Sequence, residues 1–250
     1  MNELLKHQKY LFLLAHPDDD VYCCVLARKL VDLGKEVYFV YATSGDLGGN
    51  PQEREKEVTI AVKNIGIVKE QVHFLRISEA SLLDRLYDVV NLTLEIARKN
   101  NIDCIVGQDY EGGHEGHDAV SFCASEAMRL SGMKNHFVFP VYYGKPGERK
   151  CAMFKPQRKD FITLEFSEKD RNLKKDILGV YASQRESFEK IRQSDDGYYP
   201  RLFSREVYFK INDPIDFNEK PTNEVGYEHH RNGFKFDDFK NAVEKYRKLI

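Results

Sequence analysis

The chain has 250 residues and a mass of 29.1 kDa, which is enough for one large α/β domain with a full core. Hydrophobic residues make up 42% of the sequence and charged residues 31%, a composition that excludes a disordered chain. The 38 basic and 40 acidic residues leave a net charge of −2. This balance argues against binding to nucleic acid or to an anionic membrane mainly through electrostatics.

Two further features bear on the cellular setting. No apolar run approaches the roughly 20 residues that span a bilayer, and the charged N-terminus does not resemble a signal peptide. The five cysteines lack a CxxC or zinc-finger spacing, which favours reduced thiols over disulfides. We therefore expect a cytoplasmic protein.

The first 145 residues alternate short apolar runs with longer amphipathic segments. Runs rich in β-branched and aromatic residues predict strands at Tyr10–Ala15, Val37–Ala42, Val72–Ile77, Ile102–Val106 and His136–Tyr143. Apolar residues at helical spacing predict helices between them, at Val21–Leu33, Arg54–Ile65, Leu82–Ala97 and about His117–Leu130. The alternation predicts a three-layer α/β fold, with a doubly wound, mostly parallel, Rossmann-like sheet. Such sheets bind ligands outside the carboxyl ends of their strands.

The remaining chain is less regular. The pattern predicts a strand at Asp160–Phe166, a long helix at Glu168–Ile191 and a closing helix at Asp237–Ile250. Tyr198–Lys210 is aromatic and irregular, and Asn212–Asn232 reads as a long loop or arm. Because no linker separates these parts, we expect a single domain over residues 1–250. Its core would span about residues 8–190, and residues 191–250 would form a C-terminal elaboration.

A dense group of ionisable residues follows the first predicted strand. His16, Asp18, Asp19 and Asp20 stand within five residues, at the sheet edge where ligands are expected. Carboxylates held so close repel one another and resist desolvation unless a cation is present. Alternatively, Asp20 could cap the helix expected to start near Val21, but that explanation leaves His16 without a role.

A second polar cluster follows the fourth predicted strand and therefore reaches the same edge of the sheet. It includes His114 and His117, which are three residues apart and occupy neighbouring positions of a helical turn. The preceding Gly112 and Gly113 let the backbone approach a bound group closely. A polar loop with incidental histidines is the alternative interpretation.

Together the two clusters offer the ligands of a metal site. One imidazole and one carboxylate from the first loop, with one imidazole from the second, make a set of three. A catalytic zinc site has three protein ligands of this type and keeps one position for water. With no suitable cysteine pattern, these ligands favour Zn²⁺, although Fe²⁺, manganese and cobalt also fit.

These motifs resemble those of a known family. The loop His16-Pro17-Asp18-Asp19 after an N-terminal strand, with a later His-x-x-His, is similar to the PIG-L/LmbE-like family of zinc-dependent N-acetylglucosaminyl deacetylases. Weaker similarities lie at Arg54, Glu57, Ala61, Ile65-Gly66 and Ser183-Gln184. The resemblance covers roughly residues 10–190. It implies an enzyme that hydrolyses the amide bond of an N-acetyl group.

The resemblance also implies a role for particular residues. Three of them would bind zinc: His16, Asp19 and His117. Asp18 would be the general base that activates the metal-bound water. His114 would stabilise the oxyanion or donate a proton to the leaving amine, and Arg54 would anchor the substrate, through a phosphate or carboxylate on the aglycone.

Two positions depart from the family's pattern. Asp20 stands where a glutamate is common, and Gly116 stands where many members have an aspartate just before the second histidine. That aspartate can orient the preceding histidine. His114 therefore needs another carboxylate, Glu115 or Asp118, to take over this role.

We therefore expect a metal-dependent hydrolase that removes the acetyl group from an N-acetylated amino sugar of the N-acetylglucosamine type, or from its conjugate. Its partner would be a small-molecule substrate, with no nucleic acid and no membrane span. Three alternatives stay open: an amidase or deacylase for another acyl amide, a catalytically degenerate sugar-binding protein, and a nucleotide-binding protein. The last is weakened because the glycine-rich segment Thr43–Asn50 lacks the Gly-Lys-Ser/Thr of a P-loop.

Overall fold

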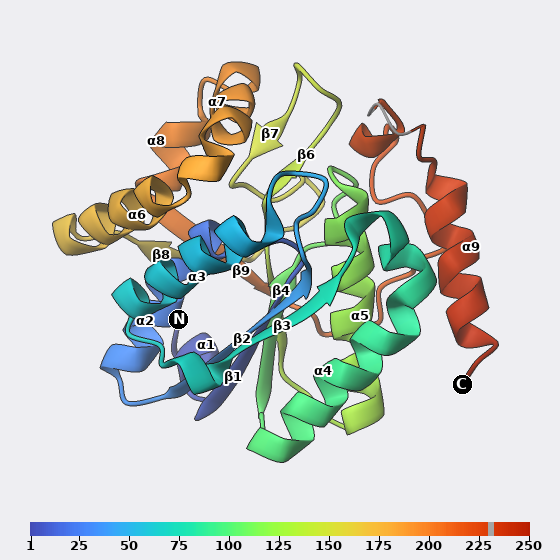
Figure 1. Ribbon diagram of the computed structural model, residues 1–250, viewed down its shortest axis with the longest axis horizontal. Coiled ribbons are helices and arrows are strands. Elements are labelled where there is room, and N and C mark those ends of the chain that lie inside the picture. Colours follow the sequence, from blue (N-terminus) through green and yellow to red (C-terminus); the bar gives the residue numbers. More distant parts are fainter. Residues whose placement is uncertain (230–232) are drawn as a thin grey trace.

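A seven-stranded, mostly parallel sheet forms the centre of the protein, as the computed structural model shows for residues 1–229 and 233–250 (Figure 1). Its strand order is β3-β2-β1-β4-β5-β9-β8. The parallel strands are β1 (Lys9–Leu14), β2 (Glu36–Thr43), β3 (Val72–Ile77), β4 (Cys104–Gln108) and β5 (His136–Phe139). The antiparallel additions are β9 (Arg205–Lys210), which pairs with β5, and β8 (Ile162–Glu165), which pairs with β9. The predicted fold class is confirmed.

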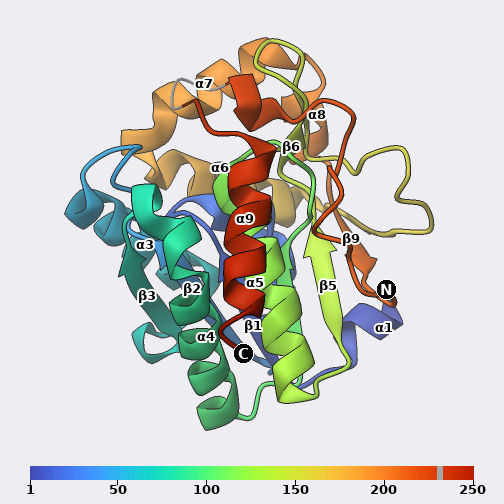
Figure 2. The same cartoon turned by 90° about the vertical axis from the view of Figure 1, so that its right-hand side faces the viewer.

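Helices cover both faces of this sheet (Figures 1 and 2). One layer consists of α2 (Cys24–Asp32), α3 (Pro51–Ile65) and α6 (Glu168–Val180). The other consists of α4 (Leu86–Asn100), α5 (Glu115–Ser131) and α9 (Phe236–Arg247). The alternation of β1 explains the two cores, because its even-numbered residues pack into the first layer and its odd-numbered residues into the second. All of these β1 core side chains are fully buried, as a central strand of a three-layer fold requires.

Shorter elements complete the chain. They are α1 (Asn2–Leu5), α7 (Arg185–Ser194), α8 (Tyr198–Leu202) and the small antiparallel pair β6 (Tyr142–Tyr143) and β7 (Lys150–Cys151). Two 3₁₀ turns matter for the site: η1 (Asp19–Tyr22) and η3 (Glu79–Arg85). The five cysteines are all buried and free. Within residues 1–229 and 233–250, no helix combines the length and apolar character needed to cross a membrane.

The strand order reverses between β1 and β4. The chain steps from β1 to β2 and β3 on one side, and β4 and β5 lie on the other side of β1. The loops that leave β1 and β4 therefore diverge and open a crevice at their carboxyl ends, which is where doubly wound sheets bind ligands. The two polar clusters seen in the sequence sit on these two loops.

Several sequence-based boundaries differ from the structure. The helix expected at Val21–Leu33 begins only at Cys24, because η1 precedes it. The expected long helix Glu168–Ile191 breaks at Tyr181, where the Tyr181 hydroxyl donates a hydrogen bond to buried Asp20. This contact also means that Asp20 does not cap the helix near Val21.

The C-terminal third contains more regular structure than its sequence suggests. The irregular segment Tyr198–Lys210 forms α8 and β9, and β9 lies inside the sheet between β5 and β8. The expected strand His136–Tyr143 is split into β5 and β6 around Pro140. The segment Asn212–Asn232 contains the 3₁₀ turn Gly226–His229, and its last three residues lie outside the described part of the chain.

The buried Glu206 side chain joins β9 to both α2 and α6. The Glu206 carboxylate accepts hydrogen bonds from the backbone N–H groups of Val25 (3.0 Å) and Leu26 (2.8 Å), and so satisfies the first turn of α2. It also lies 2.6 Å from the Lys174 ammonium, and both side chains are almost fully buried, at 2% and 0% exposed. A residue of the C-terminal elaboration thus caps the helix that follows the His16 loop.

We predict that Glu206→Gln lowers the free energy of unfolding by about 3 kcal/mol, because it leaves the Lys174 ammonium buried without a counter-charge. Urea denaturation followed by circular dichroism measures this loss. Glu186→Gln is the matched control, since the Glu186–Lys190 pair is exposed, and its denaturation midpoint should not move. Equal behaviour of the two variants would contradict the role given to the buried pair.

Candidate metal centre and active site

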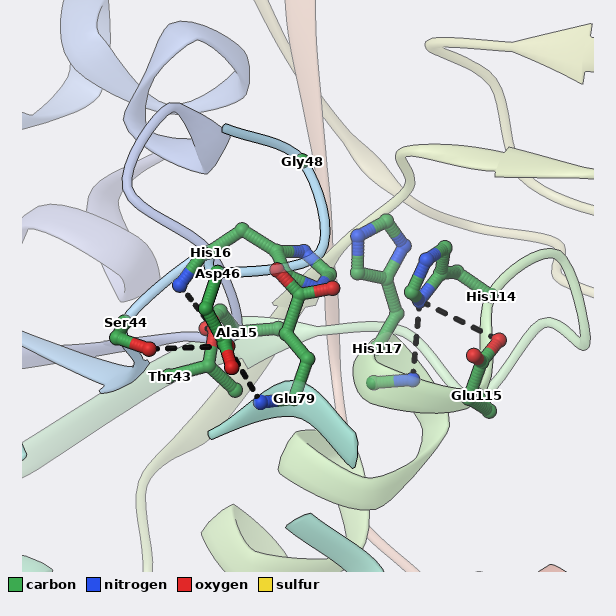
Figure 3. A network of polar contacts seen from close by, with 12 residues as sticks. Ala15, His16, Thr43, Ser44, Asp46, Gly48, Glu79, His114, Glu115 and His117 are labelled. Carbon is green, nitrogen blue, oxygen red and sulfur yellow. Dashed lines mark hydrogen bonds and ion pairs between the residues drawn. The ribbon is translucent and has the colours of Figure 1, made fainter. Parts of the chain in front are cut away.

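Three imidazole rings meet in the crevice between the β1 and β4 loops (Figure 3). One ring nitrogen from each of His16, His114 and His117 lies within 4.8 Å of the other two. The His16 and His117 side chains are 9% and 3% exposed, whereas His114 is 22% exposed. Two segments that lie about a hundred residues apart in sequence therefore build one buried cluster with an accessible side at His114.

Asp19 lies between two of these rings. Its Oδ2 atom is 3.3 Å from Nδ1 of His16, and its Oδ1 atom is 3.3 Å from Nε2 of His117. Neighbouring ligands of a tetrahedral zinc ion, each roughly 2.0–2.2 Å from the metal, are separated by about 3.4 Å. His16, Asp19 and His117 therefore have the donor chemistry of a metal site, and Asp19 lies at ligand spacing from each ring, through a different oxygen atom for each. His114 is the alternative third ligand, at the longer separation.

The ring nitrogens of His16 and His117 that do not face Asp19 lack a partner in the described protein. Nε2 of His16 and Nδ1 of His117 are buried and have no hydrogen-bond partner within the described ranges. A buried polar atom without a partner is costly and signals a group that is meant to be present. These nitrogen atoms are not the ones that face Asp19, so a water molecule or a substrate group is needed to satisfy them.

The charges around the cluster also favour binding of a cation. Burial lowers the pKa of His16, but the carboxylates of Glu79 and Asp19 outweigh it and raise the pKa to about 9. Burial acts to raise the pKa of Asp19, but the imidazoles of His117 and His16 prevail and hold it well below its usual range. The cluster thus retains anionic oxygen and attracts positive charge, which a divalent cation supplies more fully than a proton.

Asp18 adjoins the ligand cluster and contacts Arg54. Nη2 of Arg54 donates a 2.7 Å hydrogen bond to Oδ1 of Asp18. Burial raises the pKa of Asp18, and the Arg54 guanidinium opposes this only in part. A carboxylate that binds a proton more readily than usual suits a general base that must accept one near neutral pH.

Arg54 itself is 97% buried, because its side chain lies under the loop after β2. Its Nη1 atom donates a hydrogen bond to the Gly45 carbonyl (2.9 Å). An added Cβ at Gly45 or Gly48 would lie within 2.6 Å of the guanidinium, so glycine at these positions lets the loop close over Arg54. The guanidinium is therefore directed at Asp18 and the loop, and its predicted role as a substrate anchor remains a prediction.

His114 has a defined ring orientation. Its Nδ1 atom accepts a hydrogen bond from the backbone N–H of Gly116 (3.1 Å), so a neutral ring carries its proton on Nε2. Glu115 Oε2 lies 3.6 Å from the same Nδ1, close enough to stabilise positive charge on the ring. Asp118 does not share this role, because it accepts the backbone N–H groups of Glu111 and Gly112.

Glu79 is the site residue that the sequence analysis missed. Its carboxylate lies 3.9 Å from both His16 Nε2 and Arg54 Nη1. Figure 3 shows Glu79 beside His16. Asp46 fixes this position by accepting hydrogen bonds from Ser78 Oγ (2.5 Å) and the Glu79 backbone N–H (2.8 Å). Glu79 follows β3 at the same sheet edge as the other site residues, and that placement was the available signal.

Three of the positions with weaker similarity to the family connect the site to the rest of the chain: Glu57, Ser183 and Gln184. Ser183 donates from its backbone N–H and its hydroxyl to the Glu57 carboxylate of α3, at 2.8 and 2.6 Å. Gln184 Nε2 donates to the Gly48 carbonyl at 3.1 Å. These contacts fasten the turn after α6 to α3 and to the loop that covers Arg54.

Two adjoining cavities open at this edge. The smaller, of about 150 Å³, is lined by the three candidate metal ligands together with Asp18 and Arg54. The larger, of about 640 Å³, shares His16, Glu79 and His114 with it. The candidate catalytic groups therefore stand between a small polar space and a wider one.

Comparison with known proteins agrees with this geometry. The model of the PIG-L family, described as GlcNAc-PI de-N-acetylase, matches residues 11–128, a stretch that contains both histidine loops. Residues 11–128 are therefore similar to this family. The resemblance seen in the sequence is confirmed, and with it the expectation of an enzyme that acts on an amide bond. No curated protein matches the full sequence.

Solved structures share the fold of this chain at low identity. N,N'-diacetylchitobiose deacetylase from Pyrococcus horikoshii is 18% identical, with a TM-score of 0.64 over 85% of this chain and 86% of its own. The zinc-inhibited form of teicoplanin deacetylase is 14% identical, with a TM-score of 0.62 over 83% of this chain and all of its own. The 4-carboxy-2-hydroxymuconate hydratase of Pseudomonas putida is also 14% identical, with a TM-score of 0.55 over 83% and 98%. Because a hydratase shares the fold, the fold alone does not determine the reaction, which depends on the residues of the site.

Gly116 has a steric reason to be glycine. A Cβ atom at this position would lie 2.9 Å from Nε2 of His16 and 3.2 Å from Nδ1 of His114. Any side chain there pushes on a candidate metal ligand. The departure from the family's aspartate at this position thus accompanies close packing of the two loops.

We predict that Gly116→Ala weakens zinc binding by about tenfold, because the added methyl group displaces the His16 ring. Competition with a chromophoric chelator measures the affinity. Gly179→Ala in α6 is the matched control, since nothing lies within 4 Å of its added Cβ, and its zinc affinity should equal that of the wild type. Equal affinities for all three proteins would show that His16 is not held by this contact.

Proposed function

We propose that this protein is a zinc-dependent hydrolase that removes the acetyl group from an N-acetylated amino sugar of the N-acetylglucosamine type, or from its conjugate. The observation that carries the proposal is the pair of 3.3 Å separations that join Asp19 to His16 and His117, with Asp18 beside them. The family description and the deacetylases among the solved structures support the substrate class. The five free, buried cysteines support the predicted cytoplasmic location.

His16, Asp19 and His117 would hold the metal ion. When bound, zinc would lower the pKa of a water molecule to about 7 and polarise the amide carbonyl. Fe²⁺ also suits imidazole and carboxylate ligands, so the native metal is part of the proposal. The buried carboxylates stabilise either divalent ion through their charge.

Asp18 carries out both proton transfers of the proposed reaction. Its carboxylate accepts a proton from the attacking water, and its raised pKa makes that transfer favourable. The same proton then passes to the nitrogen atom as the C–N bond breaks, so that a neutral amine leaves. Arg54 holds Asp18 in place through the 2.7 Å hydrogen bond.

His114 stabilises the oxyanion. With Nδ1 occupied by the Gly116 N–H, the neutral ring presents Nε2–H as a hydrogen-bond donor. A neutral imidazole is a poor proton source, because losing Nε2–H would leave an anion. Of the two roles inferred from the family resemblance, the hydrogen-bonding geometry therefore favours oxyanion stabilisation over proton donation.

The small cavity favours a small acyl group. Its volume of about 150 Å³ is bounded on one side by Val141 and Tyr142, next to the metal ligands. An acetyl group fits such a space, whereas a long acyl chain needs more room. This observation weighs against the alternative of a deacylase for long acyl amides, and the full set of candidate catalytic groups weighs against a degenerate sugar-binding protein.

We predict that Asp18→Ala retains zinc and loses about 10²- to 10⁴-fold in kcat, because a general base contributes that much. His117→Ala should lose the metal and the activity together. Acetate release from N-acetylglucosamine conjugates and metal analysis of the purified variants measure the two effects. Full activity in both variants would reject the assignment of the site.

We also predict that a strong chelator abolishes acetate release and that stoichiometric Zn²⁺ or Fe²⁺ restores it. The metal ion that restores the higher kcat identifies the native cofactor. Excess zinc is added separately, because a solved relative is described as zinc-inhibited. Undiminished hydrolysis after complete removal of metal, verified by elemental analysis, would overturn the proposed metal dependence.

A further inference from the structure

A further cavity lies between α6, α7 and α8, which form one group of helices in Figure 1. Its volume is about 260 Å³. Two charged residues that border it, Lys175 and Arg185, are exposed. Much of its remaining wall is aliphatic or aromatic and comes from Leu178, Tyr181, Phe188, Tyr199 and Phe203. A wall of this kind suits an alkyl chain.

Phe188 separates this cavity from the small catalytic space. Among the described lining residues, Phe188 alone is common to the 260 Å³ cavity and to the 150 Å³ space that contains the candidate metal ligands. The residue is buried, at 5% exposed. Phe188 therefore lies where one space ends and the other begins.

The periodicity of α7 explains why a single residue borders both spaces. Ser187 and Ile191 line the small space, whereas Arg185 and Glu189 line the further cavity. At 100° per residue, Phe188 lies about 60° from Ile191 in one direction around the helix axis and about 60° from Arg185 in the other. It thus stands at the boundary between two faces of α7, each of which lines one space.

The arrangement of the three cavities favours the small space for the acyl group. The 640 Å³ cavity meets the candidate metal centre at His16, Glu79 and His114 and has room for a sugar ring. With the sugar there, an amide carbonyl at the metal ligands directs its acyl group into the 150 Å³ space. A chain longer than acetyl needs more room than this space provides, and Phe188 stands between it and the adjoining cavity.

We propose that Phe188 restricts the enzyme to short acyl groups by closing the catalytic space against the 260 Å³ cavity. This inference rests on the proposed function, since it takes the amide carbonyl to be at the metal centre. Without the Phe188 ring, the two spaces join and an unbranched acyl chain extends between α6, α7 and α8. The role is steric, so Phe188 determines which acyl groups are hydrolysed and takes no part in the proton transfers.

A series of N-acylglucosamines tests the role of Phe188. The substrates are N-acetyl-, N-propionyl-, N-butyryl- and N-hexanoylglucosamine, and release of the common product glucosamine gives kcat/KM for each. For the wild type, kcat/KM should fall about 100-fold from acetyl to hexanoyl. Phe188→Ala should raise the hexanoyl-to-acetyl ratio of kcat/KM by about 100-fold, because the ring no longer blocks the chain. A parallel change for all substrates would indicate a purely structural role and overturn the inference.

Two matched variants show whether the joining of the spaces is what matters. Ile191→Ala enlarges the small space alone and should raise the propionyl-to-acetyl ratio by about tenfold at most, with no gain for hexanoyl. Phe203→Ala enlarges the further cavity alone and should leave the whole series as in the wild type. A gain for hexanoyl in either variant equal to that of Phe188→Ala would contradict the separation by Phe188.

A milder substitution keeps the test decisive if the alanine variant does not fold. Phe188→Ala removes a buried ring and can cost about 3–5 kcal/mol of stability, so urea denaturation first verifies a cooperative transition. Phe188→Leu removes less volume and should raise the butyryl-to-acetyl ratio by about tenfold. With this variant alone, an unchanged butyryl-to-acetyl ratio would overturn the inference.

Binding of carboxylic acids in the presence of Zn²⁺, measured by calorimetry, separates this inference from the proposed function. The probes are acetate and hexanoate, and Phe188→Ala should bind hexanoate about tenfold more tightly than the wild type, with equal affinity for acetate. If no amide is hydrolysed but this gain is found, the proposed function fails and the role of Phe188 stands. If acetate is released but Phe188→Ala changes neither the kcat/KM ratios nor the affinity for hexanoate, the role of Phe188 fails and the deacetylase stands.

Discussion

Buried negative charge at the carboxyl ends of β1 and β4 is the constraint on which the rest of this site depends. Asp18, Asp19 and Glu79 are brought together in a space where a carboxylate without a partner is costly. Arg54 balances only part of this charge, through Asp18. The His16 imidazole balances a further part, because the carboxylates of Glu79 and Asp19 raise its pKa to about 9. A divalent ion held by Asp19, His16 and His117, as proposed, would balance the remaining charge.

Residues of the C-terminal half of the chain form hydrogen bonds with the segments that build this charged crevice. Tyr181 donates a hydrogen bond to Asp20, whose pKa burial raises to about 7, and Ser183 donates to Glu57. Lys155 lies below the second histidine loop, where its ammonium donates hydrogen bonds to the carbonyls of Tyr110 and Pro221. Each contact satisfies a polar group that the fold would otherwise bury alone. Distant segments therefore complete the hydrogen bonding of the crevice and hold its loops in place.

The fold and the two histidine loops could be predicted because local patterns specify them. Apolar strands such as β1, with fully buried side chains on both faces, have a strong sequence signature, and the placement of polar residues after β1 and β4 follows from the parallel sheet. The insertion of β9 between β5 and β8 could not be predicted, since its pairing depends on long-range contacts that the irregular segment Tyr198–Lys210 does not reveal. The place of Glu79 in the site could not be predicted, because a single glutamate in a loop has no distinctive sequence pattern. Its position next to His16 arises only when β3 and β1 share a sheet.

The cap that Glu206 provides to α2 has a consequence for how the protein forms during synthesis. This contact joins residues 180 positions apart, so the first turn of α2 stays unsatisfied until Glu206 has left the ribosome. Every proposed metal ligand has been made long before that moment. The nascent chain thus carries its proposed ligands without the support that fixes them, and the proposed metal site can reach its final geometry only after β9 has emerged from the ribosome.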